Sequence, residues 1–410
     1  MDKPAVCRPN GNNRKDAAAI GLDMQTVLTA KRLFDGIKLV EDPVVILEDG
    51  CVTSIAPRAS AAMPAGAHVL DFPEATLAPS FFDVHIHGAA GHDAMEATPG
   101  ALAAIGRFLA SRGTGSFLAT TVTAPLEATL HAVSGIAKLI AQEPADGAAR
   151  PLGIHLEGPF LSHAKRGVHP PEYLLEPDIG IFDKLFEASE GQVRLMTLAP
   201  ELPGAPELAV HAAKRGVRVS LGHSNATAAE TRAAIAAGAS SATHTFNAMR
   251  TLDHREPGIL GEALTDDRLY AELICDGVHS MPEIARLWWR AKGPERAILV
   301  TDAMSAAGMP DGEYKLGGLT VQVAQGRATT DGVLAGSVLT LDRALVNFLK
   351  FTGATVEQGL RLLSSNPAAM AGFENQVGRV RVGGAANLAA VGSEGSLEAS
   401  FLNGRIVSAA

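Results

Sequence analysis

The chain has 410 residues, of which 47% are hydrophobic and 19% charged, and its formal net charge is −9 at pH 7. This length is enough for one large domain with a smaller companion, and the composition is that of an ordinary globular enzyme. The acidic balance argues against nucleic acid as the main partner, and no apolar run approaches the length that spans a membrane.

Both ends of the chain are rich in short strand-like runs. The first 23 residues are polar and lack the apolar core of a signal peptide, which predicts a disordered tail and a cytoplasmic location. From 24 to 79 short apolar runs alternate with turn signals such as Asp35-Gly36, and this style returns in 375–410, beginning with a strand-like run at 377–382. We therefore expect a small β-sandwich domain assembled from residues 24–79 and 375–410.

The middle of the chain, residues 80–374, alternates between apolar strand-like runs and Ala/Leu-rich helical stretches. This pattern predicts an α/β fold, a (β/α)8 TIM-like barrel, whose active site lies at the carboxyl ends of the strands. A doubly wound open sheet is the alternative, although no Gly-rich nucleotide loop follows the first strand. A Gly-rich, hairpin-like insertion is expected at 308–336, after the eighth strand. The expected strands are 80–86, 115–121, 152–157, 193–198, 217–222, 241–246, 270–275 and 297–301, and the expected helices are 100–112, 126–142, 206–215, 226–237 and 282–291.

Several of these predicted strands end in a side chain that can bind a metal ion, followed by a turn residue. His85 and His87 lie two apart on one strand, so their side chains point to the same face. A histidine taken singly is more often structural than a ligand, but the recurrence of this pattern predicts that the strand ends converge on a metal-assisted active site. The other such residues are Glu157, His223, His244, His279 and Asp302.

Glu157, His223 and His244 offer one oxygen and two nitrogens, which leaves a position open for water, as in a catalytic zinc site. A metal ion held there lowers the pKa of bound water to near 7. Asp302 follows the eighth strand, where a carboxylate can take the proton of that water and later deliver it to a leaving group. Its alternative role is that of a helix N-cap. His155 lies within the third strand and is expected behind the ligands.

With these residues, the chain resembles the N-acetylglucosamine-6-phosphate deacetylase family of the amidohydrolase superfamily from about residue 24 to residue 407. The motifs that carry the resemblance are His-Leu-Glu-Gly-Pro-Phe at 155–160, Lys-Arg-Gly-Val-His at 165–169, Gly-His-Ser at 222–224, Thr-His-Thr-Phe-Asn-Ala-Met at 243–249, Arg-Glu-Pro-Gly at 255–258, Asp-Gly-Val-His at 276–279, Thr-Asp-Ala at 301–303 and Leu-Ala-Gly-Ser at 334–337.

The resemblance implies roles for individual residues. It implies a divalent metal ion on Glu157, His223 and His244, with Asp302 as general base and acid and His169 polarising the acetyl carbonyl. Because this chain keeps His85 and His87, a second ion bridged by Glu157 is expected, so that each subunit holds one or two. Zinc is the expected ion, and iron or another divalent metal also suits these ligands. The implied substrate-binding residues are Val168, His169, Asn247, Ala248, Arg255, Asp276, Gly277, Val278, His279, Leu334, Ala335 and Gly336.

The implied reaction is hydrolysis of N-acetyl-D-glucosamine 6-phosphate to D-glucosamine 6-phosphate and acetate, in amino-sugar catabolism. Backbone N–H groups of Asn247 and Ala248 would approach the phosphate, and Arg255 would reach it from a neighbouring subunit, which implies a homodimer. The sequence leaves open the N-acetylgalactosamine 6-phosphate epimer, another amidohydrolase activity on a cyclic amide or an amine, and a barrel without catalysis. The absence of lysine at the end of the fourth strand argues against another amidohydrolase activity. The presence of every expected ligand argues against a barrel without catalysis.

Overall fold

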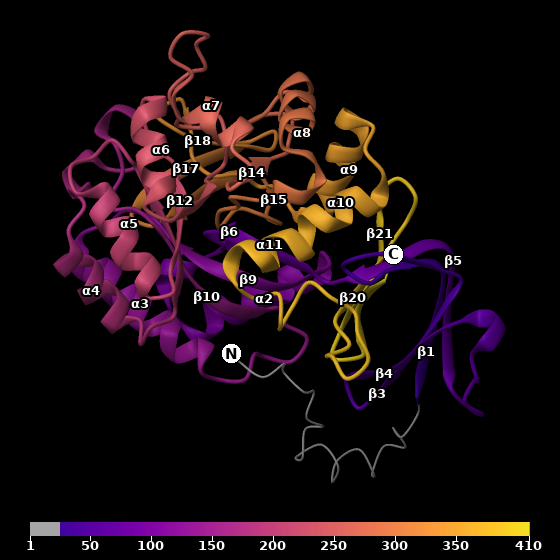
Figure 1. Ribbon diagram of the computed structural model, residues 1–410. Helices are drawn as coiled ribbons and strands as arrows, with labels where there is room; N and C mark the ends of the chain where they lie inside the picture. The colour runs from indigo at the N-terminus through magenta and orange to yellow at the C-terminus, as the bar shows by residue number, and fades with distance from the viewer. Residues whose placement is uncertain (1–24, 410) are drawn as a thin grey trace.

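Eight parallel strands form the central sheet of the protein (Figure 1). The structure, a computed structural model, describes residues 25–409, so the predicted tail at 1–23 lies outside the described residues. The strands pair in chain order, each with the next, and they are β6 (Phe81–Ile86), β9 (Thr114–Thr121), β10 (Arg150–Glu157), β11 (Val193–Leu198), β12 (Arg218–Leu221), β13 (Ala239–Ala242), β14 (Tyr270–Ile274) and β15 (Ala297–Val300).

The first and last strands of this sheet meet, so the sheet is nearly closed. The Asp302 N–H donates to the His85 carbonyl at 2.9 Å, and the His87 N–H donates to the Ala303 carbonyl at 2.8 Å. Below these contacts the Thr301 hydroxyl donates to the buried Asp83 carboxylate at 2.6 Å. The (β/α)8 barrel prediction is therefore confirmed, and the open doubly wound sheet is excluded.

Helices surround the barrel (Figure 1). Their apolar side chains are buried in the cores that they share with the strands. The five predicted helices are present, and α4, α7 and α9 to α11 are additional. The prediction missed α7 because most of its residues are apolar and buried, so its sequence lacks the polar face that marks an amphipathic helix. The helices are α2 (Pro99–Ser111), α3 (Leu126–Ile140), α4 (Ile179–Ala188), α5 (Ala205–Lys214), α6 (Ala228–Ala236), α7 (Gly258–Thr265), α8 (Pro282–Arg296), α9 (Leu341–Thr352), α10 (Val356–Leu363) and α11 (Ser365–Ala371), with short 3₁₀ turns at Arg58–Ser60, Ala94–Glu96, His163–Lys165 and Pro171–Tyr173.

A second sheet lies beside the barrel and contains strands from both chain ends, as expected (Figure 1). In its middle, β5 pairs in parallel with β1 and antiparallel with β20. The domain limits at 24–79, 80–374 and 375–410 stay a prediction. The order is β22-β21-β20-β5-β1-β3-β4, with β2 beside β1, for β1 (Thr26–Phe34), β2 (Leu39–Glu41), β3 (Pro43–Glu48), β4 (Cys51–Pro57), β5 (His68–Pro79), β20 (Leu388–Val391), β21 (Leu397–Leu402) and β22 (Arg405–Ala409).

The strand-like run at 377–382 is not a strand, and that expectation was wrong. Gly378 has φ of +78°, so the chain turns there instead of extending, and a Cβ at this position would lie 2.8 Å from the Ser364 carbonyl oxygen. The alternation of valine and arginine in this run therefore accompanies an irregular connection.

The insertion after β15 is an antiparallel sheet, as the 308–336 pattern predicted. Its strands are β16 (Gly312–Leu316), β17 (Leu319–Ala324), β18 (Arg327–Thr330) and β19 (Val333–Leu334), and a small ribbon pairs β7 (Gly88–Ala89) with β8 (His92–Asp93). Apolar side chains of the insertion pack against Val122 and Met304, next to the strand ends of the barrel. Within the described residues no helix is both long and apolar enough to cross a membrane.

Candidate metal centre

The predicted metal ligands lie together at the carboxyl ends of the barrel strands. Glu157 is the last residue of β10, and His223, His244 and Asp302 each follow their strand by two residues. The backbone at these last three residues has positive φ, +47°, +27° and +49°, a conformation that non-glycine residues seldom adopt. The chain therefore turns sharply after each strand, and such local strain gathers at functional sites.

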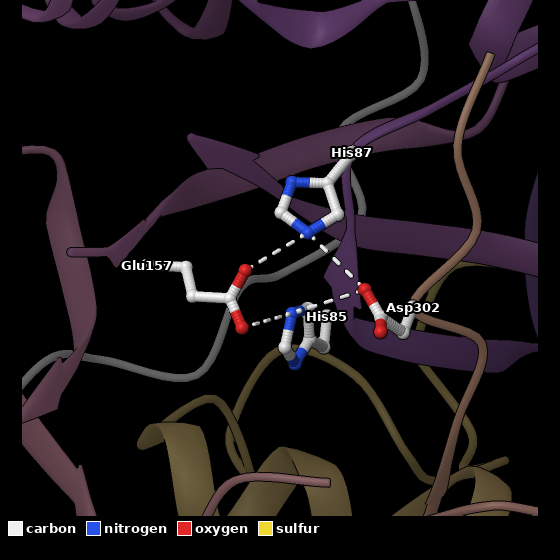
Figure 2. Close-up of side chains that lie close together, drawn as sticks. All are labelled: His85, His87, Glu157 and Asp302. Carbon is white, nitrogen blue, oxygen red and sulfur yellow. Dashed lines mark ion pairs between the residues drawn. The ribbon is translucent and has the colours of Figure 1, made fainter. Parts of the chain in front are cut away.

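Two histidines and two carboxylates form the first cluster. Figure 2 shows His85, His87, Glu157 and Asp302 pointing toward one another. The His87 Nε2 atom lies 3.1 Å from both Glu157 Oε2 and Asp302 Oδ1. The His85 Nε2 atom lies 3.4 Å from Glu157 Oε1 and 3.5 Å from Asp302 Oδ1. One nitrogen or oxygen atom from each of the four lies within 4.8 Å of the others, and all four side chains are buried.

The second cluster shares Glu157 with the first. Glu157 Oε1 lies 3.2 Å from His223 Nε2 and 3.0 Å from His244 Nε2, and the two nitrogens are 3.1 Å apart. The His223 Nδ1 atom faces the Lys165 carbonyl at 3.0 Å, and since a carbonyl only accepts, Nδ1 carries the proton. Burial lowers the pKa of His223 to about 4, so the ring is neutral and its Nε2 lone pair faces the carboxylate.

Buried carboxylates dominate the electrostatics of the first cluster. Burial disfavours protonation of His87, but hydrogen bonds with Asp302 and Glu157 outweigh it and raise the pKa of His87 to about 9. Burial likewise opposes ionisation of Glu157, yet the charge of His85 and its histidine hydrogen bonds hold the pKa of Glu157 well below its usual range. Positive charge beside the carboxylates of Glu157 and Asp302 therefore stabilises their ionised forms.

These residues fit a divalent metal ion. The buried His85 Nε2 atom has no hydrogen-bond partner among the described residues, although it points between two carboxylate oxygens. In the second cluster the His223 lone pair meets a carboxylate oxygen, which is also an acceptor. A cation between the nitrogens and oxygens removes both conflicts, and imidazole with carboxylate suits zinc, iron and similar ions.

His169 reaches the same centre from the loop after β10. Its Nε2 atom lies 3.5 Å from Glu157 Oε2, and its ring centroid lies 4.6 Å from that of His223. Thr123, which sequence reasoning missed, contacts the other ring nitrogen with its hydroxyl at 2.8 Å.

His155 lies behind the ligands, as expected for a supporting residue. Its Nε2 atom is 2.9 Å from the Thr197 hydroxyl, and its ring meets the His85 ring edge-on with centroids 4.6 Å apart. Burial lowers the pKa of His155 well below its usual range, so this ring is neutral. It packs against His85 on the side away from the cluster.

Several predicted substrate residues lie around the cluster. The Ser337 N–H donates to the Asp302 carbonyl at 2.7 Å, which places residues 334–336 beside Asp302. Val168 packs against the apolar cluster that contains Ala335. The Ser224 N–H donates to the Ala248 carbonyl at 3.0 Å, which sets Asn247 and Ala248 beside His223.

The Asp276–His279 segment forms a tight turn around its own carboxylate. Asp276 Oδ1 accepts the N–H groups of Val278 at 2.8 Å and His279 at 2.7 Å, and Oδ2 lies 2.7 Å from His279 Nδ1. Gly277 has φ of +77°, as this turn requires. Burial opposes protonation of His279, but the Asp276 hydrogen bond prevails and raises its pKa.

Arg255 is not brought to the cluster within one chain. It is exposed on the connection between β13 and α7, which projects from the body in Figure 1. No ion pair engages its guanidinium within residues 25–409, and only its backbone N–H is held, by Asp253 at 2.8 Å.

Glu272 is a further residue that sequence reasoning missed. It is fully buried in the middle of β14 and contacts both His85 and the backbone of His244. The sequence signal was a single glutamate inside the apolar run Tyr270–Ile274, where burying a charged side chain costs stability.

Known proteins resemble this chain over nearly its whole length. The amidohydrolase family model matches residues 76–407. The chain is 39% identical to an N-acetylgalactosamine-6-phosphate deacetylase of Escherichia coli O157:H7, covering 94% of this chain and 100% of the relative. It is 36% identical to an N-acetylglucosamine-6-phosphate deacetylase of Vibrio furnissii, covering 92% and 94%.

A solved structure also resembles this chain over nearly its whole length. This is a mutant N-acetyl-D-glucosamine-6-phosphate deacetylase from Mycobacterium smegmatis in complex with N-acetyl-D-glucosamine-6-phosphate. The TM-score is 0.87 at 34% identity, with 94% of this chain and 100% of that chain covered.

Proposed function

The chain belongs to the amidohydrolase family and, within it, to the deacetylases of N-acetyl amino-sugar 6-phosphates, and we propose that it hydrolyses N-acetyl-D-glucosamine 6-phosphate to D-glucosamine 6-phosphate and acetate. It is a hydrolase of an acetamide bond. The observation that carries the proposal is the buried cluster around Glu157, where two histidine pairs and Asp302 meet at the open end of the barrel. We place the enzyme in amino-sugar catabolism and in the cytoplasm.

We propose that Glu157, His223 and His244 hold one divalent ion, and that His85, His87 and Glu157 hold a second. Zinc is the ion we propose, and iron or another divalent metal suits the same donors. A bound ion supplies Lewis acidity, since it lowers the pKa of a water molecule and polarises the amide carbonyl. The protein contributes a dry, rigid set of ligands fixed at the strand ends.

Asp302 is the proposed general base and acid. Burial opposes its ionisation, but the charges of His85 and His87 and a hydrogen bond from His87 lower its pKa, so it is ionised. It therefore accepts a proton from the attacking water and returns it to the departing amine. His169 directs Nε2 into the cluster, where an N–H can donate to the amide oxygen as charge develops on it.

The substrate residues follow from the ring of segments around the cluster. We assign Asp276–His279 and Leu334–Gly336, together with Val168 and His169, to the sugar. Asn247 and Ala248 are assigned to the phosphate. The Asn247 N–H already donates to His244, whereas the Ala248 N–H makes no hydrogen bond within residues 25–409, so Ala248 is the freer backbone donor.

Arg255 is proposed to reach the phosphate in a neighbouring subunit of a homodimer. Its exposure, its lack of an acidic partner in the described chain and its position on a projecting connection support this role. A guanidinium is well suited to phosphate because its planar donors match two phosphate oxygens.

The epimer with an axial C4 hydroxyl is a second candidate substrate. A relative named for N-acetylgalactosamine 6-phosphate is 39% identical over 388 residues, which favours including it. The two substrates share the phosphate and the acetamide, so the same cluster and the same chemistry serve both.

Acetate release by purified, metal-analysed protein tests the proposal. N-acetylglucosamine 6-phosphate, its galactosamine epimer and unphosphorylated N-acetylglucosamine are offered in parallel, with Asp302→Asn protein as the inactive control. We expect rapid release from N-acetylglucosamine 6-phosphate, slower release from its epimer, and none from the unphosphorylated sugar. Preference for the epimer would change the substrate and keep the mechanism, whereas no release from any of the three, with metal bound, would contradict the proposed activity.

A further inference from the structure

A single carboxylate oxygen inside the barrel contacts both clusters. Glu272 Oε2 lies 3.3 Å from His85 Nδ1 and accepts the His244 backbone N–H at 3.1 Å. Glu272 comes from β14, whose carboxyl end supplies none of the proposed metal ligands, and its exposed fraction is 0%. It therefore stands beneath the site and outside the ligand set.

Its surroundings do not explain why a carboxylate is buried there. Within residues 25–409 no lysine or arginine pairs with Glu272, and its second oxygen, Oε1, has no hydrogen-bond partner. A buried carboxylate so poorly paired is costly, and an apolar side chain of similar size would stabilise the fold better. The residue is therefore better explained by what it does to His85 and His244.

Glu272 determines which nitrogen of His85 carries a proton and which presents its lone pair to the cluster. A carboxylate oxygen that faces a ring nitrogen accepts its proton in a hydrogen bond, so when the His85 ring gives up one proton to bind a metal ion, the proton that it keeps lies on Nδ1. This leaves the Nε2 lone pair aimed at the space between Glu157 and Asp302, 3.4 and 3.5 Å from their oxygens. A carboxylate that holds a histidine in this way fixes the ring orientation and strengthens its lone pair as a ligand.

The other histidines of the first and second clusters lack this support. The Nδ1 atoms of His87 and His244 are buried without a hydrogen-bond partner among the described residues, and that of His223 faces a neutral carbonyl. His85 is thus the ligand whose tautomer depends on a charged group, and the same group also holds the backbone from which the His244 side chain extends.

We infer that Glu272 is a positioning residue that prepares His85 to bind the second metal ion, and that it couples this site to the first through the backbone of His244. The inference rests on the proposed function only in that the cluster binds divalent ions. Whether the substrate is one epimer or the other does not affect it.

Metal stoichiometry and affinity test the inference without substrate. Zinc-free protein is titrated with zinc, and the bound ions per chain are counted, for wild type, Glu272→Leu, Glu272→Gln and His85→Asn. We expect two ions on the wild type, one on Glu272→Leu and one on His85→Asn. Glu272→Gln keeps a carbonyl acceptor and should keep the second ion with affinity weakened about 10- to 100-fold.

The double variant separates positioning from general destabilisation. If Glu272 acts through His85, Glu272→Leu with His85→Asn binds one ion, just as each single variant does. The visible spectrum of the cobalt-loaded protein should lose the same component in Glu272→Leu and in His85→Asn. Two zinc ions bound by Glu272→Leu with wild-type affinity, or a wild type that binds only one, would overturn the inference. Should Glu272→Leu fail to fold, an unchanged second affinity in Glu272→Gln would overturn it equally.

A failure of the inference can be distinguished from a failure of the proposed function. Wild type that binds two ions and releases no acetate would contradict the function and leave the role of Glu272 testable by the same titration. Wild type that is active while Glu272→Leu binds two ions normally would contradict only the role of Glu272.

Discussion

The Thr123 backbone determines which nitrogen of His169 carries the proton in the neutral ring. The Thr123 N–H points at His169 Nδ1 with 3.3 Å between the nitrogens, and an N–H can only donate. Nδ1 is therefore the acceptor in the neutral ring, and the proton lies on Nε2, 3.5 Å from Glu157 Oε2. Once substrate is bound, this N–H is the donor available to the amide oxygen. The Thr123 hydroxyl, 2.8 Å from Nδ1, adds a second contact that holds the ring.

Removing the Thr123 hydroxyl should weaken catalysis more than binding. Thr123→Val keeps the shape of the side chain and loses one hydrogen bond of about 1 kcal/mol, so kcat should fall about 5- to 10-fold with KM and metal content unchanged. Steady-state kinetics of acetate release measure this. Thr123→Ser keeps the hydroxyl and is the control, which should stay near wild type. A loss in Thr123→Ser with none in Thr123→Val would show that packing of the threonine methyl group matters instead.

Replacing Asp302 should separate proton transfer from metal binding. In Asp302→Asn the amide has no basic oxygen to take the proton of water, so turnover should fall by about a hundred- to ten-thousand-fold. The cluster of Glu157, His223 and His244 does not include Asp302, so at least one ion per chain should remain. Elemental analysis and acetate release on the same sample check both expectations. Wild-type turnover would rule out the role of Asp302.

Glu157 belongs to both clusters, and its loss should therefore empty both. Glu157→Gln removes the shared negative charge, and we expect less than about one ion per chain with no measurable acetate release. His87→Asn is the matched control because His87 belongs to the first cluster only, so one ion should remain. Equal metal content in the two variants would contradict a bridging role for Glu157.

The sequence predicted most of the barrel because its signals are local. Each strand is a short apolar run that ends in a polar side chain and a turn, and these features lie within a few neighbouring residues. The least accurate strand was the one predicted at 241–246, which the structure places at Ala239–Ala242. The chain leaves the sheet before His244, where φ is +27°, and it turns again at Phe246, where φ is +81°. Nothing in the residue types of this segment marks those turns.

The missed residues depend on contacts that the sequence does not encode locally. Glu272 and His85 are 187 positions apart, and Thr123 and His169 are 46 apart. In the sequence Thr123 resembles any small polar residue after a strand, and Glu272 resembles an isolated charge. Only the closure of the barrel brings each beside its histidine. The metal ligands were predictable because histidine and glutamate at several strand ends share one chemistry, whereas a supporting residue can be of many types.

Mixed dimers test the proposed role of Arg255. Arg255→Ala should raise KM for the phosphorylated substrate about 10- to 100-fold, because a charge-assisted hydrogen bond to phosphate is lost, and it should leave metal content unchanged. If Arg255 acts in the neighbouring subunit, a dimer of one Arg255→Ala chain and one Asp302→Asn chain contains one complete site. Random mixing of equal amounts makes half of the dimers mixed, so activity measured at substrate concentrations well below KM should recover to about a quarter of wild type. No recovery after mixing and re-association would place Arg255 in its own subunit's site, and an unchanged KM in Arg255→Ala would place it outside any site.

A buried lysine on α8 should make the free energy of unfolding depend on pH in the alkaline range. Lys292 is only 6% exposed, and its ammonium donates to the Asp266 carbonyl at 2.9 Å. Burial lowers the pKa of Lys292 from 10.5 to about 8, although Asp267 and Asp266 oppose this shift, and Arg296 adds to it. Between those two pH values the unfolded chain binds the proton and the folded chain does not, so folding stability from this group rises with pH.

Lys292→Met removes this contribution while keeping the length of the side chain. The free energy of unfolding of wild type relative to Lys292→Met should be constant below about pH 8. It should then increase by up to about 1.4 kcal/mol per pH unit toward pH 10.5. Urea denaturation at several pH values from 7 to 10 measures the difference, with the exposed Lys184→Met on α4 as a control for removing one positive charge. A wild-type minus Lys292→Met difference that does not change with pH would mean that Lys292 keeps its proton in the folded protein, held by the Asp266 carbonyl and the neighbouring carboxylates. In that case these partners would offset the cost of taking the charge out of water.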